Sequence, residues 1–315
     1  MVPSFGQLSR SWSGRVGIVV GAGVLGLGVG AFAAAAVGLV KAVVSRPVLV
    51  SKAMEMGAKR VVVVPASTKG DDGQVREVEE GGSDGDVKIL GVLFDMDGTL
   101  VETFGIWATL LDACAKEMGY KDGVDREAYR GVFGQPMEKN VEVFMPGADV
   151  SAVTAYCNAH YGEYLDQLQV LDGALEAVDA AVALFGSRVG LVTNCPAAIT
   201  QLILQAAKLE STFSVVACSG AEAVPATQML SPRASGARKL RGKPHTDMLD
   251  YAAAQLGLDT SECLMVGDTR YDMLAGEAAG CVTVAVEPSP LAHVQLAGIE
   301  EFGAWLRHRP RTAGE

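Results

Sequence analysis

Residues 91–103 read GVLFDMDGTLVET, and this stretch decides the fold. It begins inside an apolar run, residues 89–94, that is typical of a strand buried on both faces of a parallel sheet. Asp95 and Asp97 follow, at the strand end where such sheets place their ligands. Two carboxylates so close together repel each other in a low-dielectric cleft, so the pattern predicts a compensating divalent cation. Oxygen ligands without a nearby His or Cys favour Mg²⁺ over zinc.

Three later segments carry polar side chains after strand-like runs or in a loop. They read RVGLVTN at 188–194, RGKPHTDML at 241–249 and ECLMVGDTRYD at 262–272. Together with 91–103, and in this order, they resemble the four motifs of the haloacid-dehalogenase superfamily of phosphohydrolases. The likeness is to its phosphoglycolate-phosphatase-like and β-phosphoglucomutase-like members, which carry a small helical cap. The resemblance covers residues 89–299.

Short apolar runs alternate with helical patterns, which predicts an α/β fold with a doubly wound parallel sheet. The expected strands are 89–94, 189–193, 213–217, 263–266 and 282–286, and the expected helices are 173–185, 197–208, 246–256, 272–279 and 299–306. Helical spacing also predicts helices at 107–118, 126–132, 137–144 and 152–168. The resemblance implies a Rossmann-like core in which these last helices form a cap that closes over the site, and the loop 134–136 resembles one that faces the substrate.

These patterns divide the chain into parts. We expect a membrane anchor or targeting segment at 1–45, a largely disordered linker at 46–86, a catalytic core at 87–104 and 170–306, a helical cap at 105–169, and a surface insertion within the core at 218–242. The linker prediction rests on residues 67–86, which are rich in Gly, Ser and acids and have almost no apolar side chain. A β-like run at 60–64 has no place in this scheme.

The resemblance also implies a role for each motif residue. Asp95 would attack phosphorus and form an aspartyl-phosphate, and Asp97 would act as general acid and then as general base. Lys243 would bridge the nucleophile and the phosphate. The other expected ligands are Gly98, Thr99, Thr193 and Asn194 for the phosphate, with Asp95, Asp268, Asp272 and the main-chain carbonyl of Asp97 for Mg²⁺. Asp97 also argues against a dehalogenase, in which that acid is absent.

Three functions fit these residues. A phosphatase acting on a small phosphorylated metabolite is favoured, and a phosphosugar mutase of the β-phosphoglucomutase kind uses the same core. A non-enzymatic, membrane-tethered binding protein is the alternative of another class, although its expected signature, the loss of a motif acid, is missing. The substrate and the oligomeric state stay open.

The charge of the chain is unevenly distributed. Its net charge is −11, from 26 basic and 37 acidic residues. Residues 1–54 hold five of the basic residues and no acid, so the rest carries 21 basic against 37 acidic residues, a net of −16. Such an acidic body repels polyphosphate backbones, which argues against a nucleic-acid partner. The six cysteines form no CxxC pair and are predicted to be reduced, buried thiols.

Residues 16–40 contain no charged or hydrogen-bonding side chain and are long enough to cross a hydrocarbon layer of about 30 Å. They predict a transmembrane helix, and thus a membrane-anchored protein. The Ser- and Arg-rich residues 1–15 favour, as the alternative, a cleaved segment that targets a mitochondrion or plastid. Residues 21–26 fit the dinucleotide pattern GxGxxG, but no acid follows before Glu55, so we interpret these glycines as helix-packing positions.

The segment 218–242 is longer than is usual in the family and contains a basic cluster. The cluster consists of Arg233, Arg238, Lys239 and Arg241. A surface insertion is the favoured interpretation. The alternative is an electropositive rim that attracts an anionic substrate toward Lys243.

Overall fold

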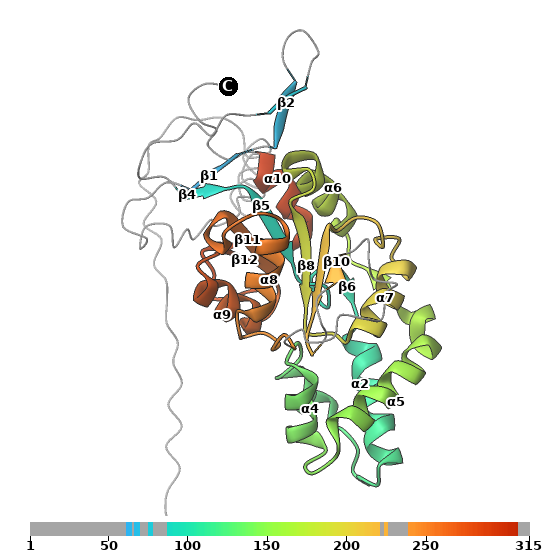
Figure 1. Cartoon of the computed structure of the whole chain (residues 1–315). Helices are drawn as coiled ribbons and strands as arrows, with labels where there is room; N and C mark the ends of the chain where they lie inside the picture. Colours follow the sequence, from blue (N-terminus) through green and yellow to red (C-terminus); the bar gives the residue numbers. More distant parts are fainter. Residues whose placement is uncertain are drawn as a thin grey trace, which may run out of the picture. The chain divides into compact units, whose positions relative to one another are not determined.

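A seven-stranded sheet forms the centre of the part of the chain that the computed structural model describes (Figure 1). The described residues are 61–64, 66–69, 75–77, 87–220, 224–225 and 239–307. The chain divides into two units, 1–46 and 47–315, and every described residue belongs to the second.

The central strand of the sheet is β5 (Gly91–Phe94), in which all four residues are buried. It pairs in parallel with β8 (Val189–Thr193) on one side and β11 (Cys263–Gly267) on the other. The full order is β10 (Val224–Pro225), β9 (Val215–Cys218), β8, β5, β11, β12 (Val282–Ala285) and β13 (Val294–Gln295). Among the described strands of this sheet, only β10 is antiparallel to its neighbour. The chain therefore leaves β5 first to one side and later to the other, which opens a crevice at the carboxyl ends of these strands.

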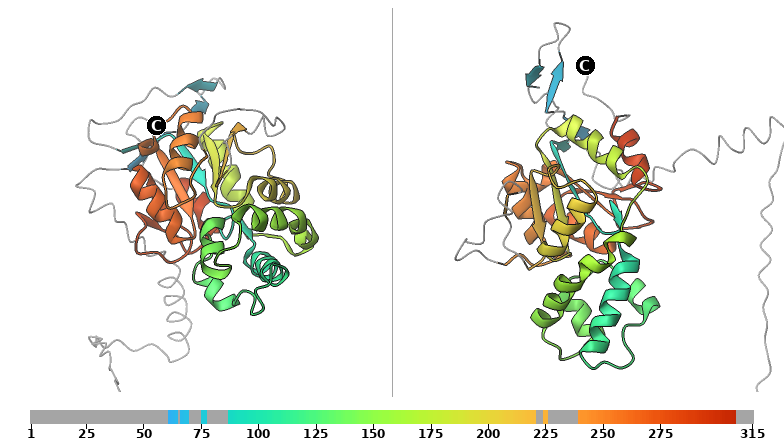
Figure 2. Two further views of the ribbon diagram at one scale, coloured as in Figure 1. Left: turned by 60° about the horizontal axis from the view of Figure 1, so that its bottom comes forward. Right: turned by 90° about the vertical axis from the view of Figure 1, so that its right-hand side faces the viewer.

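Helices cover both faces of the sheet (Figure 2). Side chains alternate along β5, so Phe94 packs with α6 (Ala174–Phe185) and α10 (Phe302–Arg307), whereas Leu93 packs with α8 (Asp247–Gln255). The other elements around the sheet are α7 (Ala197–Ala206), α9 (Arg270–Ala279), and the short 3₁₀ helices η4 (Thr260–Glu262) and η5 (Ile299–Glu301). This is the doubly wound arrangement that the alternation of strands and helices predicts.

A helical insertion separates β5 from the next strand of the sheet. Its elements are α2 (Phe104–Glu117), α3 (Arg126–Arg130), α4 (Met137–Phe144), α5 (Val150–His160) and η2 (Tyr161–Gln167). The chain leaves the core through β6 (Val101–Glu102) and returns through β7 (Gln169–Val170), and these two strands pair with each other. Figure 1 shows α2, α4 and α5 grouped beyond one end of the sheet.

Stacked aromatic rings form part of the interior of this insertion. The Phe104 ring stacks on Tyr129 at 5.8 Å and meets Phe133 edge-on at 5.5 Å. The Arg130 guanidinium lies 4.0 Å from the centre of the Phe104 ring, on its face. Such contacts each stabilise by roughly 0.5–1.5 kcal/mol beyond the burial of area. The insertion thus has apolar contacts of its own.

The first third of the chain differs from the expectation in two places. The predicted strand 89–94 is two strands, because β4 (Val87–Ile89) pairs separately with β1 (Val61–Val63). The unplaced run 60–64 therefore finds its partner there. Strands β2 (Ser67–Lys69) and β3 (Val75–Glu77) pair within the range expected to be a disordered linker, because backbone pairing needs no apolar side chain. Apart from 61–64, 66–69 and 75–77, that range lies outside the described residues, and the division into domains stays a prediction.

The membrane prediction requires a correction. Among the residues that the structure describes, no helix combines the length and apolar character needed to cross a bilayer. The longest helix in this part of the chain, α2, has 14 residues, whereas a span needs about 20. This finding contradicts the prediction of a membrane-anchored or organellar protein. That prediction rested on apolar composition at 16–40, which does not by itself establish a spanning helix, and those residues lie outside the described ones.

Candidate active site

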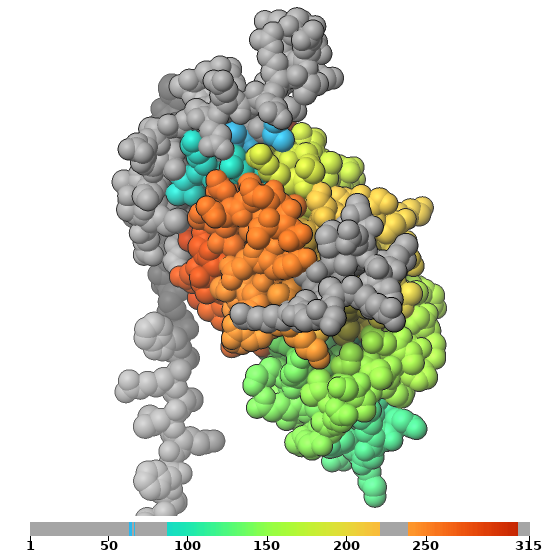
Figure 3. Space-filling view, viewed as in Figure 1, coloured from blue at the N-terminus to red at the C-terminus, as the bar shows by residue number. Residues whose placement is uncertain are grey.

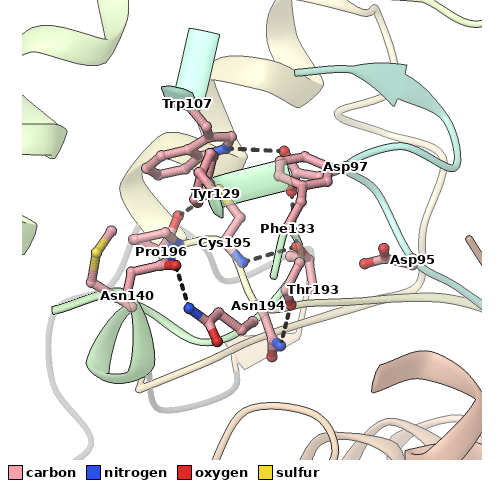
Figure 4. A pocket seen from close by; sticks show the side chains of 13 residues that line it. Asp95, Asp97, Trp107, Tyr129, Phe133, Asn140, Thr193, Asn194, Cys195 and Pro196 are labelled. Atoms are coloured by element: carbon pink, nitrogen blue, oxygen red, sulfur yellow. Dashed lines mark hydrogen bonds between the residues drawn. The ribbon is translucent and has the colours of Figure 1, made fainter. Parts of the chain in front are cut away.

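Asp95 and Asp97 directly follow β5, and both side chains are buried. The Asp97 carboxyl group accepts three hydrogen bonds. Its Oδ1 accepts from Thr103 Oγ1 at 2.6 Å. The same Oδ1 accepts from Trp107 Nε1 at 3.2 Å, and its Oδ2 accepts from Thr193 Oγ1 at 3.3 Å (Figure 4). The first two donors belong to the start of the insertion and the third ends β8. The Asp97 carboxyl group therefore joins the insertion to the sheet.

The ammonium group of Lys243 is enclosed at the same end of the sheet, with 1% of the residue exposed. Its Nζ lies 2.6 Å from Asp95 Oδ1, 2.6 Å from Asp272 Oδ1 and 2.8 Å from the main-chain oxygen of Val192. An ammonium carries three protons, so all three are used. Lys243 therefore connects two acids that lie 148 residues before it and 29 residues after it.

Asp272 and Asp268 are positioned by the loop between β11 and α9. Asp272 lies in the first turn of α9, where its Oδ2 accepts hydrogen bonds from Thr269 N at 2.9 Å and Thr269 Oγ1 at 2.5 Å. This capping box satisfies main-chain donors at the helix start and fixes the side chain. Asp268 Oδ1 accepts from Thr99 Oγ1 at 3.0 Å, so the Thr99 hydroxyl is engaged by an acid.

Three carboxylates converge on one point. Single oxygens of Asp95, Asp268 and Asp272 all lie within 4.8 Å of one another. Gly98 adjoins them with a φ of +82°, and a Cβ at this position would overlap the Asp268 carboxylate. Only glycine fits this turn without strain. A set made only of oxygens fits Mg²⁺, whereas the Asp97 side chain is turned toward its hydrogen-bond donors.

Burial and nearby negative charges raise the pKa values of Asp95 and Asp268, and burial raises the pKa of Asp97. Burial, followed by the charge of Asp272, raises the pKa of Asp95 to about 7, against the lowering effect of Lys243. Burial raises the pKa of Asp97, although its hydrogen bonds favour the ionised form. Burial and the neighbouring Asp95 and Asp272 charges raise the pKa of Asp268 well above its usual range. One lysine among four acids leaves excess negative charge that a divalent cation would offset.

Asn194 links three segments of the chain. Its Nδ2 donates to Gly134 O of the insertion at 2.7 Å and to Lys243 O at 3.0 Å, and its Oδ1 accepts from Lys243 N at 2.7 Å. The side-chain amide is therefore committed to main-chain groups. Thr193 Oγ1 likewise accepts from the Cys195 main-chain N–H at 3.0 Å. The binding of a phosphoryl oxygen by Thr193 and Asn194 stays a prediction.

A pocket opens between the insertion and the sheet end (Figure 4). Its lining residues are Asp95, Asp97, Thr193, Asn194, Cys195 and Pro196 from the core, with Trp107, Tyr129, Phe133, Gly134, Gln135, Met137 and Asn140 from the insertion. The loop 134–136, which resembles a substrate-facing cap loop, contributes to this lining. The two carboxyl groups after β5 thus face an otherwise aromatic and amide-lined space.

Sequence reasoning missed the insertion residues that contact Asp97. Thr103 and Trp107 are four residues apart, and the main-chain N–H of Trp107 donates to Thr103 O at 2.9 Å as α2 begins. An i, i+4 pair at the start of a helix lies on one face. That spacing was a usable signal, since the helix begins soon after the paired acids. Tyr129 and Asn140 carried no comparable signal.

The basic cluster is only partly described. Arg241 is paired with Asp247, with Nε to Oδ2 at 3.0 Å and Nη2 to Oδ1 at 2.7 Å. This pairing occupies the Arg241 guanidinium at the start of α8. Lys239 is exposed, whereas Arg233 and Arg238 lie outside the described residues. The electropositive-rim hypothesis therefore stays untested.

Several known proteins are similar to this chain. A phosphoglycolate phosphatase of Yersinia pestis is 27% identical over 210 residues, covering 63% of this chain and 81% of the relative. A probable phosphatase, IndB, of Dickeya dadantii is 29% identical over 204 residues, covering 62% and 80%. Relatives of this kind indicate a phosphatase, as the motifs predict.

Solved structures share the fold. The CbbY protein of Rhodobacter sphaeroides, as a variant in complex with xylulose-(1,5)bisphosphate, has a TM-score of 0.55 at 16% identity, covering 68% of this chain and 96% of that one. A β-phosphoglucomutase of Clostridium difficile has a TM-score of 0.53 at 17% identity, covering 68% and 92%. A family model described as haloacid dehalogenase-like hydrolase matches residues 92–286, which include the residues of all four motifs. The chain therefore belongs to the haloacid dehalogenase-like hydrolase family.

Proposed function

We propose that the chain is a Mg²⁺-dependent phosphatase that hydrolyses the monoester of a small metabolite through an aspartyl-phosphate on Asp95. The observation that carries this proposal is the pair of 2.6 Å contacts from Lys243 to Asp95 and Asp272. Three motifs far apart in the sequence meet in these two contacts. The phosphatase names of the relatives support the same reaction.

In the first step, a carboxylate oxygen of Asp95 forms a bond to phosphorus as the bond to the ester oxygen breaks. Lys243 holds the Asp95 carboxylate through Oδ1 and so limits its rotation. Holding the nucleophile in line with the breaking bond is the main requirement of phosphoryl transfer. The Lys243 charge also lies beside the place where the negative phosphoryl oxygens gather.

Asp97 moves the protons. Its raised pKa keeps a proton available, which it gives to the leaving alcohol oxygen. As a carboxylate it then takes a proton from water, whose oxygen attacks phosphorus and releases phosphate from Asp95. Thr103 and Trp107 bind Oδ1 throughout, and they orient the carboxyl group toward the pocket.

Asp95, Asp268 and Asp272 would hold the Mg²⁺ ion. When bound, this cation offsets the charge of the carboxylates and of the phosphoryl oxygens. The repulsion that raises the pKa values of Asp95 and Asp268 would be relieved in the same way.

The alternatives lose support to different degrees. A non-enzymatic binding protein is disfavoured because the chain belongs to a hydrolase family and keeps every motif acid. The mutase structure among the similar ones shows the fold alone, so it does not favour that reaction. Dependence on glucose 1,6-bisphosphate would identify a mutase.

The test is phosphate release from a panel of phosphate monoesters, with Mg²⁺ and with EDTA. We expect release that requires Mg²⁺ and that falls by roughly 10³-fold or more in Asp95→Asn. The matched control is Asp122→Asn, which changes an exposed aspartate in the insertion and leaves turnover unchanged. Turnover retained in Asp95→Asn, or unaffected by EDTA, contradicts the proposal.

A further inference from the structure

Two neutral amides lie in the wall of the pocket opposite the reacting carboxylates. Gln135 and Asn140 are 9% and 5% exposed, and both line the pocket. Gln135 Nε2 donates to Asn140 Oδ1 at 2.8 Å. Figure 4 places Asn140 on the side of the pocket away from Asp95. A leaving group attached to phosphorus at Asp95 would extend toward this pair.

The shared hydrogen bond leaves a complementary set of groups. It uses one proton of the Gln135 amide and the carbonyl oxygen of Asn140. The Gln135 Oε1 acceptor and the Asn140 Nδ2 donor make no side-chain hydrogen bond with another described residue, and neither is a buried atom without a partner. Both therefore face accessible space. A hydroxyl group both donates and accepts hydrogen bonds, so it can bind to this acceptor or to this donor.

The charge of the pocket disfavours a second anion. Among the described residues that line it, none is Lys, Arg or His, whereas Asp95 and Asp97 are both acidic. The nearby Lys243 ammonium already donates all three protons to Asp95, Asp272 and Val192. A carboxylate or second phosphate on the leaving group would be buried without a cation, and uncompensated charge is costly to bury.

Apolar side chains complete the wall. The aromatic rings of Trp107, Tyr129 and Phe133 line the pocket together with Met137. They suit the carbon skeleton of a ligand, whereas the amides suit its polar substituents. This mixture matches a hydroxylated carbon chain or ring.

We propose that Gln135 and Asn140 bind a hydroxyl group of the leaving alcohol, so that the pocket selects monophosphates of uncharged polyols or sugars over esters that carry a second anionic group. The inference rests on the proposed phosphatase function and adds the class of its substrate. It also separates this chain from the activity named for its phosphoglycolate phosphatase relatives, whose substrate name includes a carboxylate.

The experiment compares kcat/KM of the Mg²⁺-loaded chain on three kinds of ester. These are polyol and hexose monophosphates, phosphoglycolate, and p-nitrophenyl phosphate, which has neither a hydroxyl nor a second ionised group. We expect kcat/KM on the best polyol or sugar monophosphate to exceed kcat/KM on phosphoglycolate by roughly tenfold or more. A preference for phosphoglycolate overturns the inference.

The variant test removes the amides while keeping their size. Gln135→Met with Asn140→Leu should lower kcat/KM on the preferred polyol or sugar ester by roughly 10- to 100-fold, with p-nitrophenyl phosphate changed less than about threefold. The control Gln205→Leu changes an exposed amide on α7 and should leave kcat/KM on all three kinds of ester unchanged. An equal loss on all three esters in the amide variant means a structural role and overturns the inference.

A second variant covers the case in which the double variant does not fold. Asn140→Asp keeps an oxygen that accepts from Gln135, replaces the Nδ2 donor with a second oxygen and adds a negative charge. The added charge acts on every phosphate ester, so the ratio between two esters isolates the loss of the donor. Asn140→Asp should lower kcat/KM on the polyol or sugar ester relative to kcat/KM on p-nitrophenyl phosphate. An unchanged ratio of the two values overturns the inference. If wild type releases no phosphate even from p-nitrophenyl phosphate, the proposed function fails as well. If the chain hydrolyses p-nitrophenyl phosphate and has equal kcat/KM on phosphoglycolate and on polyol esters, the inference about the substrate class is overturned. The proposed phosphatase function then still holds.

Discussion

At the scale of single residues, the site is an unbalanced group of charges. Lys243 is the one cation that contacts it within the described chain, and it binds Asp95 and Asp272. Asp268 and Asp97 receive hydrogen bonds from hydroxyl and indole groups instead. The folded chain therefore holds more acid than it neutralises, and its stability must depend on pH and on cations.

The pH dependence follows from the raised pKa of Asp95. Folding raises this pKa from 3.8 to about 7, so the folded state binds the proton more tightly than the unfolded state. The contribution of Asp95 to stability is complete below about pH 4 and is lost as the pH rises through 7. Mg²⁺ binds the ionised acids, so we expect it to raise the Tm more at pH 8 than at pH 5.

Thermal unfolding with Mg²⁺ and with EDTA at the two pH values measures this difference. In Asp268→Asn, which removes one candidate ligand, the rise in Tm caused by Mg²⁺ should shrink or vanish. The same Mg²⁺ shift at pH 5 and pH 8, or none at either, would show that the acids do not form the cation site.

Trp107 permits a second test at this scale, because its indole N–H can be removed while the ring stays. In Trp107→Phe, Asp97 Oδ1 loses the donor at 3.2 Å but keeps Thr103 at 2.6 Å. We expect kcat to fall by about 3- to 10-fold, as is typical for one hydrogen bond, with KM changed little.

The double variant makes this test specific to Asp97. Once Asp97→Asn has removed the carboxyl group, Trp107→Phe should cost no further activity. Full additivity of the two losses would mean that Trp107 acts through packing against the substrate or Tyr161 rather than through Asp97.

At the scale of elements, close approach between loops joins the insertion to the sheet. Gly134 has a φ of +86°, and a Cβ there would lie 2.7 Å from Thr269 Cγ2, beside the start of α9. Gly242 is equally crowded, since a Cβ would lie 2.7 Å from Asn194 Oδ1 and 2.8 Å from Pro136 Cγ. Two glycines thus allow the hydrogen bonds of Asn194 to form.

A methyl group at Gly134 should separate these loops. Gly134→Ala strains a backbone that L residues rarely adopt and pushes the loop away from Thr269. We expect kcat/KM to fall by roughly tenfold or more, because the pocket wall moves, whereas the free energy of unfolding falls by about 1–2 kcal/mol. Enzyme kinetics and urea unfolding measure the two effects.

The matched control is Gly147→Ala, a glycine of the insertion with a φ of +88° and open space around it. It carries the same backbone strain without the contact, so it should lose a similar amount of stability and little activity. Equal losses of activity in the two variants would refute the role of the Gly134 contact.

At the scale of the whole described chain, the sheet places the chemistry. Residues that follow parallel strands share one edge, which is why the motif residues Asp95, Thr193 and Asp268 could be expected together from the sequence. The orientation of the insertion relative to the sheet could not be predicted in this way. Contacts such as that of Asn194 with Gly134 depend on how separate elements pack, and no periodicity in the sequence encodes them. The pairing of β1 with β4 depends on such long-range packing too.

The cysteines supply a test of the whole fold, since the structure confirms six buried, free thiols. Burial raises the pKa of Cys218 to about 11 and that of Cys263 to about 12, so neither forms thiolate near neutral pH. We expect a thiol reagent at pH 8 to label the chain only after denaturation. The unfolded thiols ionise near pH 9, so stability from these groups should be lost as the pH rises from about 9 to 12. Rapid labelling of the native chain would contradict this burial.

The central claim is that the four motifs meet so that Asp95 attacks phosphorus. Its most direct test is to mix the Mg²⁺-loaded chain with a hydrolysed ester, quench in acid, and locate the phosphoryl group by peptide mass spectrometry. We predict one phosphoryl group on Asp95 in the wild type and none in Asp95→Asn, which also loses turnover. A phosphoryl group on another residue, or continued turnover by Asp95→Asn, would contradict the account.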